Sequence, residues 1–150
     1  MKTQNALKNL MIIVAAVVIG ICSNLVKAAD IVVEVESLEL SNAPVQDHNE
    51  ASGGKVVAFD VQGAEAKGEV ELEPGQYNVY LIMSGKDDSH DAVYIAVGDT
   101  KKRVYPSAHP DFTKTESIFL DISEKTKYQI SLTFGEPGVL LDKIVIHLIP

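Results

Sequence analysis

The sequence predicts an all-β protein, an antiparallel β-sandwich of about nine strands. Three observations lead to this fold class. Apolar and polar residues alternate with a period of two along most of the chain after residue 30, as they do in half-buried strands. The segments between these runs are rich in Gly, Pro, Asn, Asp and Ser, which favour turns. No stretch has the apolar spacing of a long amphipathic helix.

Each strand follows from a short run, taken in chain order. Ile31, Val33 and Val35 alternate with Val32, Glu34 and Glu36 and predict a first strand over 31–36. The runs KVVAFDV and GEVELE predict the next two, and the Pro-Gly of EPGQ separates them from a central strand that begins at Tyr77. The remaining strands lie between polar turns such as SGKDDS, GDTKK, SEKTK and GEPG. The full set is 31–36, 55–61, 68–73, 77–82, 92–98, 101–105, 116–122, 128–134 and 139–148.

The first 28 residues have the pattern of a secretory signal peptide. Lys2 and Lys8 precede an apolar run from Leu10 to Cys22, which is short for a membrane span of about 20 residues. We expect cleavage after Ala28, with Ala29 as the neighbouring alternative and an uncleaved anchor as the other. A lipoprotein is not expected, because Ile21 stands where a small residue is needed before the cysteine. The sequence therefore predicts one domain, residues 29–150, in a secreted, periplasmic or cell-surface protein without stable membrane insertion.

Charge and cysteine content narrow the classes of partner. Residues 1–28 hold three of the 13 basic side chains and none of the 21 acidic ones, so the rest of the chain has a formal charge of −11. Like charge disfavours nucleic acid and anionic membrane surfaces. No cysteine occurs after Cys22, so the predicted domain is stabilised by its core, either alone or together with a bound metal.

Five motifs in order resemble carbohydrate-binding modules of families 6 and 35. They are VEVESLEL, ASGGKVVAF, EPGQYNVYL, HDAVYIAVGD and EPGVLLDKIVI, and together they span residues 33–146. The resemblance implies a galactose-binding-domain-like jelly roll, which is a non-catalytic module that recognises polysaccharide and carries a structural calcium ion.

The resemblance also implies a calcium site. Its side-chain ligands are Glu34 and Glu36 of the first strand and Asp142 at the entrance to the last strand, with backbone carbonyls near the Ser-Gly-Gly turn. Alternate residues of a strand project from one face, so both glutamates are expected on the same side. Calcium takes six to eight oxygen ligands. The alternative is that these carboxylates are exposed or are paired with Lys143 or Lys55.

The candidate sugar-binding residues lie in two predicted loops. Carbohydrate sites stack an aromatic ring on the sugar, and this chain has no Trp, so Phe112, with Tyr105 and His109 nearby, is the expected platform. Leu140 and Leu141 stand where related modules often have a polar residue. Asp88, His90 and Asp91 are expected to bind sugar hydroxyls or a second calcium ion. The alternative is a solvated acidic loop.

These features predict a secreted carbohydrate-binding module and leave open a protein-interaction module on the same sandwich. An enzyme is not expected. The sequence has no G-x-S-x-G elbow and no H-E-x-x-H motif, and no pair among its many carboxylates is singled out for glycoside hydrolysis.

Overall fold

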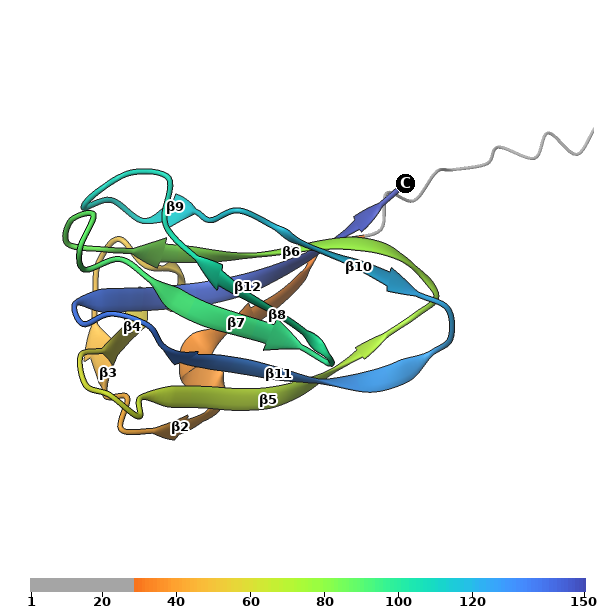
Figure 1. The fold of residues 1–150 in the computed structure, drawn as a ribbon, viewed down its shortest axis with the longest axis horizontal. Coiled ribbons are helices and arrows are strands. Elements are labelled where there is room, and N and C mark those ends of the chain that lie inside the picture. Colours follow the sequence, from red (N-terminus) through yellow and green to blue (C-terminus); the bar gives the residue numbers. More distant parts are fainter. Residues whose placement is uncertain (1–28) are drawn as a thin grey trace, which may run out of the picture.

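The alternating runs form strands in a computed structural model that describes residues 29–150 (Figure 1). This part of the chain contains 12 β-strands and two short 3-10 helices, η1 (Val35–Ser37) and η2 (Ser52–Gly54). Every paired strand is antiparallel to its neighbour. The predicted signal peptide, residues 1–28, lies outside the described residues. Within residues 29–150, no helix has the length and apolar character needed to cross a membrane.

The larger sheet has seven strands, with the long strand β12 at its centre. Its main order is β10-β6-β12-β4-β3, while β1 pairs with β12 and β9 with β6. The strands are β1 (Ile31–Glu34), β3 (Val45–Asp47), β4 (Lys55–Phe59), β6 (Gly75–Ser84), β9 (Thr113–Lys114), β10 (Ile118–Ile122) and β12 (Val139–Ile149).

The smaller sheet has five strands in the order β2-β5-β11-β7-β8. They are β2 (Glu39–Ser41), β5 (Glu65–Leu72), β7 (Val93–Val97), β8 (Thr100–Val104) and β11 (Thr126–Phe134). This sheet packs face to face on the larger one (Figure 1).

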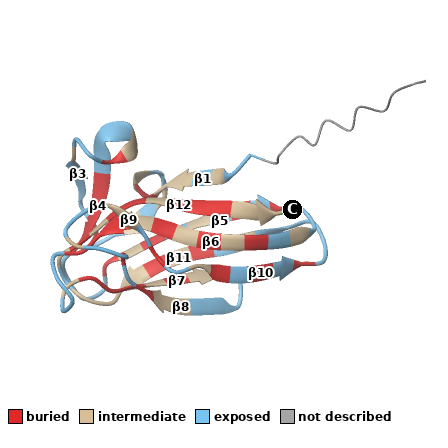
Figure 2. Cartoon of the chain, turned by 90° about the horizontal axis from the view of Figure 1, so that it is seen from above, coloured by how far each residue is buried: buried red, intermediate tan, exposed pale blue. Residues whose placement is uncertain are grey.

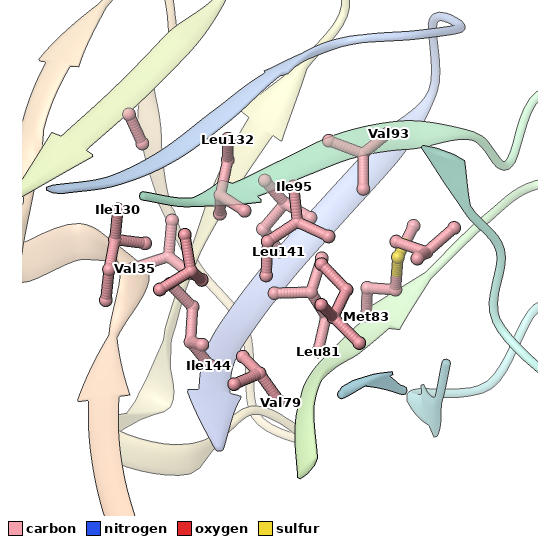
Figure 3. Close-up of a cluster of buried hydrophobic side chains, with 14 of the residues drawn as sticks. Val35, Val79, Leu81, Met83, Val93, Ile95, Ile130, Leu132, Leu141 and Ile144 are labelled. Carbon is pink, nitrogen blue, oxygen red and sulfur yellow. The ribbon is translucent and has the colours of Figure 1, made fainter. Parts of the chain in front are cut away.

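The core fills the space between the sheets because each strand turns alternate side chains inward. Along β10, buried and exposed residues alternate one by one (Figure 2). Leu81 and Ile144 of the larger sheet meet Ile95 and Leu132 of the smaller one in a fully buried cluster (Figure 3). Each such side chain contributes about 1.5 to 3 kcal/mol by leaving water. Both sheets and this core lie within residues 31–149.

The predicted antiparallel sandwich is confirmed, with 12 strands instead of about nine. The three additional strands, β2, β3 and β9, have only two or three residues each, too few for an alternating pattern. The predicted first strand, 31–36, is too long. It ends at Glu34, and Glu36 lies in η1, so the two glutamates do not share one strand face.

The loops that carry most candidate residues gather at one end of the sandwich. The segments 60–64, 85–92, 105–112 and 135–138 connect strands at the left end in Figure 1, and β12 runs from there to the opposite end. This arrangement brings segments that are far apart in the sequence together around one surface.

Candidate functional site

Asp142 lies where three elements meet. The pairing of β12 with β6 shifts between Leu141 and Lys143, so Asp142 is the extra residue of a β-bulge, which re-aims a side chain. On the other side, β12 pairs with β4 up to Leu141 and with β1 from Lys143 onward. Asp142 thus lies at the point where the partner of β12 changes from β4 to β1, and it is only 2% exposed.

Ser52 of η2 connects the carboxylates at this position. Its backbone N–H donates to Asp142 Oδ1 at 2.9 Å. Its hydroxyl oxygen lies 2.7 Å from Glu34 Oε2 and 3.1 Å from Asp142 Oδ1. A hydroxyl has one proton to donate, so it satisfies one of these two carboxylates at a time.

Negative charge at this junction is incompletely balanced within the described residues. Lys143 Nζ lies 3.7 Å from Asp142 Oδ2. Burial raises the pKa of Asp142, the bonds from Ser52 and the charge of Lys143 oppose that rise, and Glu34 adds to it. Glu36 Oε2 is buried and has no hydrogen-bond partner in the part of the chain that the structure describes.

The Ser-Gly-Gly turn has a structural reason to contain glycine. Gly53 has a φ of +67°, and a Cβ built there would lie 3.5 Å from Glu36 Oε1. A larger residue would be strained at this φ, although its Cβ would make only an ordinary van der Waals contact with the carboxylate. Glu34 and Asp142 thus meet at the Ser52 hydroxyl, and Glu36 lies beside Gly53 of the same turn. Of the lysines named as alternative partners, Lys143 contacts Asp142, whereas Lys55 pairs with Asp47.

A second candidate site is a cleft of about 420 Å³ at the loop end of the sandwich. Phe112 lies in it, and the His48 ring meets the Phe112 ring edge to face with centroids 4.9 Å apart. Leu140 of β12 adds a second apolar side chain. The remaining lining residues are Glu50, Ser84, Gly85, Lys86, Pro110, Asp111 and Gly138.

An acidic and histidine cluster lies behind one wall of this cleft. Asp91 Oδ2 lies 2.9 Å from His109 Nε2, and Asp88 Oδ1 lies 3.5 Å from His109 Nδ1. Asp88, Asp91 and His109 each offer one ligand atom, and these atoms lie within 4.8 Å of one another, so the group is able to hold a metal ion. Asp91 is only 4% exposed, which places it inside the wall instead of on the sugar-facing surface expected from the sequence.

His90 and Tyr105, the remaining predicted ligand residues, are also outside the cleft lining. His90 Nδ1 lies 2.7 Å from Asp87 Oδ1 on the exposed part of the same loop. Tyr105 follows β8 and is 41% exposed, with the Arg103 guanidinium 5.3 Å from its ring centroid. Of the six predicted ligand residues, Phe112 alone lines the cleft, and Asp88, Asp91 and His109 form the separate cluster beside it.

Sequence reasoning missed two residues that shape the cleft. His48 is 64 positions before its ring partner, Phe112, in a polar segment without a recognisable motif. Ser84 ends β6, and its hydroxyl donates to the Pro110 carbonyl at 2.5 Å. Neither contact has a signal in local sequence pattern, because each depends on how two loops meet.

The chain matches no protein-family model and no curated protein, whereas solved structures share its fold. An exo-β-1,3-galactanase from Phanerochaete chrysosporium is 20% identical with a TM-score of 0.66, over 80% of this chain and 30% of that one. A GH26-CBM35 β-(1,4)-mannanase from Podospora anserina is 14% identical with a TM-score of 0.67, over 81% of this chain and 28% of that one.

The third structure is a single module. It is the C-terminal CBM6 of a marine laminarinase from Zobellia galactanivorans, 17% identical with a TM-score of 0.65, and the match covers 79% of this chain and 99% of that one. The chain spans only about 30% of the galactanase and 28% of the mannanase. At these identities the likeness concerns the fold, which is that of the family 6 and 35 carbohydrate-binding modules.

Proposed function

We propose that the protein is a non-catalytic carbohydrate-binding module that recognises polysaccharide in the cleft around Phe112. The observation that carries this proposal is an open cleft with an aromatic ring at the loop end of a sandwich that resembles a CBM6 domain over 99% of that domain. We also propose that residues 1–28 direct the protein to the cell exterior, the periplasm or the cell surface.

The cleft combines the two kinds of contact that a sugar requires. Phe112 and Leu140 provide apolar surface for the C–H groups of a sugar ring. Lys86 and Asp111 provide a donor and an acceptor for hydroxyl groups. Because a Phe ring has a smaller face than the indole of Trp, we expect weak binding to a single chain and stronger binding to repeated ligand units.

Calcium is the metal that we propose for the carboxylates around Asp142. The available side-chain ligands are oxygens from Glu34, Glu36 and Asp142, which suit Ca²⁺. Two observations support the fit, namely the buried Glu36 Oε2 without a partner and the single Ser52 hydroxyl between two carboxylates. A divalent cation would neutralise this excess charge and would hold η1, η2 and β12 together.

The calcium site and the cleft are connected through the loop that precedes β4. The backbone N–H of His48 donates to the Gly54 carbonyl at 2.9 Å, and the backbone N–H of Ala51 donates to the His48 carbonyl at 3.2 Å. Ser52 therefore belongs to a closed loop that also carries His48 and Glu50 of the cleft. An ion at Asp142 would fix this loop and, through it, one side of the cleft.

Binding to a panel of polysaccharides tests the proposal. Residues 29–150 would be screened in calcium against β-1,3-galactan, β-1,4-mannan, β-1,3-glucan and acidic polysaccharides, with reducing ends measured in the same samples. Saturable binding without new reducing ends supports a non-catalytic module. Release of reducing ends would contradict that part of the proposal. No binding across the panel would favour a protein-interaction module on the same fold.

A further inference from the structure

The cluster behind the cleft differs chemically from the carboxylates around Asp142, because it includes an imidazole. We propose that Asp88, Asp91 and His109 form a second metal site, selective for a divalent ion of the Zn²⁺ type. The three residues come from the two loops 85–92 and 105–112, so an ion bound there would join these loops.

The positions of the ligand atoms suit a small divalent cation. Zn²⁺ bonds to nitrogen and oxygen at about 2.0 to 2.2 Å, so two ligands of one ion lie about 3 to 4 Å apart. Asp91 Oδ2 and His109 Nε2 are 2.9 Å apart, which is a hydrogen-bond distance, so a bound ion would move these two atoms slightly further apart. Asp88 Oδ1 lies 3.5 Å from the other ring nitrogen, Nδ1, and its side chain is 99% exposed, so rotation of this free side chain would bring it to an ion bound by Asp91 and Nε2.

A second observation points to a ligand at the cluster. Asp91 is 4% exposed, and its Oδ1 is buried without a hydrogen-bond partner in the described part of the chain. A buried carboxylate oxygen without a partner is costly in free energy. The other oxygen of this carboxylate already contacts His109, so the unpartnered atom belongs to the same cluster. A cation bound by this carboxylate would compensate the unsatisfied charge.

The imidazole determines which class of metal the cluster favours. Imidazole nitrogen suits Zn²⁺ and neighbouring transition metals, whereas calcium takes six to eight oxygens. The cluster offers one nitrogen and two carboxylates, each of a ligand type that Zn²⁺ binds, and leaves a further position for water. It is therefore distinct from the proposed calcium site, whose side-chain ligands are all oxygen.

The site would also stiffen one wall of the cleft, a consequence that rests on the proposed function. Pro110 follows His109, lines the cleft and accepts a bond from Ser84. Gly85 also lines the cleft and is so close to Asp91 that an added Cβ would lie 2.4 Å from Asp91 Cβ. The metal site itself does not depend on glycan binding.

Calorimetric titration tests the site. Residues 29–150 are stripped with chelator, returned to calcium buffer so that any calcium site is filled, and titrated with Zn²⁺. One equivalent of Zn²⁺ should bind. Asp88→Asn and His109→Gln should each weaken binding by about tenfold or more, since even supporting residues of metal sites have effects of 10- to 100-fold. Because Asp88 is fully exposed, Asp88→Asn keeps the fold intact, which its melting curve would verify.

The matched control is His90→Gln, which removes the neighbouring histidine of the same loop. His90 pairs with Asp87 instead of the cluster, so Zn²⁺ affinity should be unchanged. Absence of Zn²⁺ binding, or equal loss in His90→Gln and His109→Gln, would overturn the proposal. So would Zn²⁺ binding that neither Asp88→Asn nor His109→Gln weakens. If Zn²⁺ binds as expected but no polysaccharide does, the metal site stands and the proposed glycan function fails.

Discussion

Ser52 and Asp142 are hydrogen-bonded to each other although 90 residues separate them in the sequence. The Ser52 N–H donates to Asp142 Oδ1, and this bond joins the turn before β4 to the bulge in β12. Lys143, the residue after Asp142, lies opposite Glu34 in the antiparallel pairing of β12 with β1. The junction therefore links the first and last strands of the larger sheet through one buried carboxylate.

Removal of calcium should lower the stability of the fold. A ligand that binds only the folded state contributes about 2.7 kcal/mol at a hundredfold excess over its Kd. For a domain of this size, that free energy corresponds to a fall in melting temperature of roughly 5 to 15 °C on adding chelator. Asp142→Ala should remove the difference between the two melts and should itself cost about 1 to 3 kcal/mol, because the Ser52 N–H loses its acceptor.

Asp47→Ala is the matched control for calcium sensitivity. Asp47 lies on β3, the strand that pairs with β4, and its side chain is 92% exposed. This variant should keep the response to chelator. Superimposed melts of the unmodified protein with calcium and with chelator would contradict the calcium site.

Phe112→Ala should weaken glycan binding about tenfold or more without changing the melting temperature by more than a few degrees. The reason is that Phe112 supplies the aromatic surface of the cleft. Affinity electrophoresis in polysaccharide gels measures the effect. The sequence alone suggests a double variant with Asp91→Ala, but the buried Asp91 also supports the wall, so Phe112→Ala alone is the cleaner test.

Phe119→Ala provides the control for this experiment. Phe119 is 53% exposed on β10 and does not line the cleft. Its truncation removes the same ring and should leave binding unchanged. Equal losses in both variants, or full binding by Phe112→Ala, would place the glycan site on another surface.

Ionisation of Glu136 should make the free energy of unfolding decrease as the pH falls below the usual pKa of a glutamate, 4.5. Burial opposes ionisation of Glu136, but donation from the Asp91 and Ala92 N–H groups and the charge of Arg103 outweigh it and lower the pKa from 4.5. A lowered folded-state pKa stabilises the fold above pH 4.5, and this contribution disappears as pH falls through the folded-state value. Glu136→Gln should cost about 1 to 3 kcal/mol near pH 7 and much less near pH 3.

Urea denaturation at several pH values, in chelator, measures this effect. Glu39→Gln removes the same charge from an exposed position on β2 and should change the free energy of unfolding little at any pH. A deficit of Glu136→Gln that is constant from pH 3 to pH 7 would show that ionisation of Glu136 is not its cause.

Gly85→Ala should destabilise the protein by about 1 to 3 kcal/mol. A Cβ at Gly85 would lie 2.7 Å from the Asp91 Cα, so backbone would have to move. Gly68→Ala is a matched comparison, since its Cβ would meet the end of the Leu38 side chain at 2.5 Å, and a side chain can rotate away. Gly68→Ala should have a higher melting temperature than Gly85→Ala in thermal melts. The reverse order would contradict the close packing of Gly85 on Asp91.

The sandwich could be predicted from the sequence because its long strands each have one buried face. In β6, for example, Tyr77, Val79, Leu81 and Met83 are buried in alternation, and the sequence pattern reports this directly. The end of β1 could not be predicted in the same way. Val35 continues the apolar alternation and is buried, but it belongs to η1. One buried side chain in a short helical turn gives the same sequence pattern as one more strand residue.

The candidate sites depended on different kinds of information. The grouping of Glu34, Glu36 and Asp142 followed from the resemblance to family 6 and 35 modules, and the structure places all three around η2. The bulge that turns Asp142 has no local signal, because it exists only in the pairing of β12 with β6. The burial of Asp91 was also invisible, since its loop reads as polar throughout.

The direction of β12 has a practical consequence for measuring affinity. Its first residues lie beside the cleft, and its last residue, Ile149, pairs with Gln76 at the opposite end of the sandwich (Figure 1). Eleven residues of strand separate the two ends, a distance of about 35 Å. A biosensor surface coupled through a tag after Pro150 would therefore hold every molecule with its cleft facing the solution, so long polymers could reach many copies at once and report avidity directly.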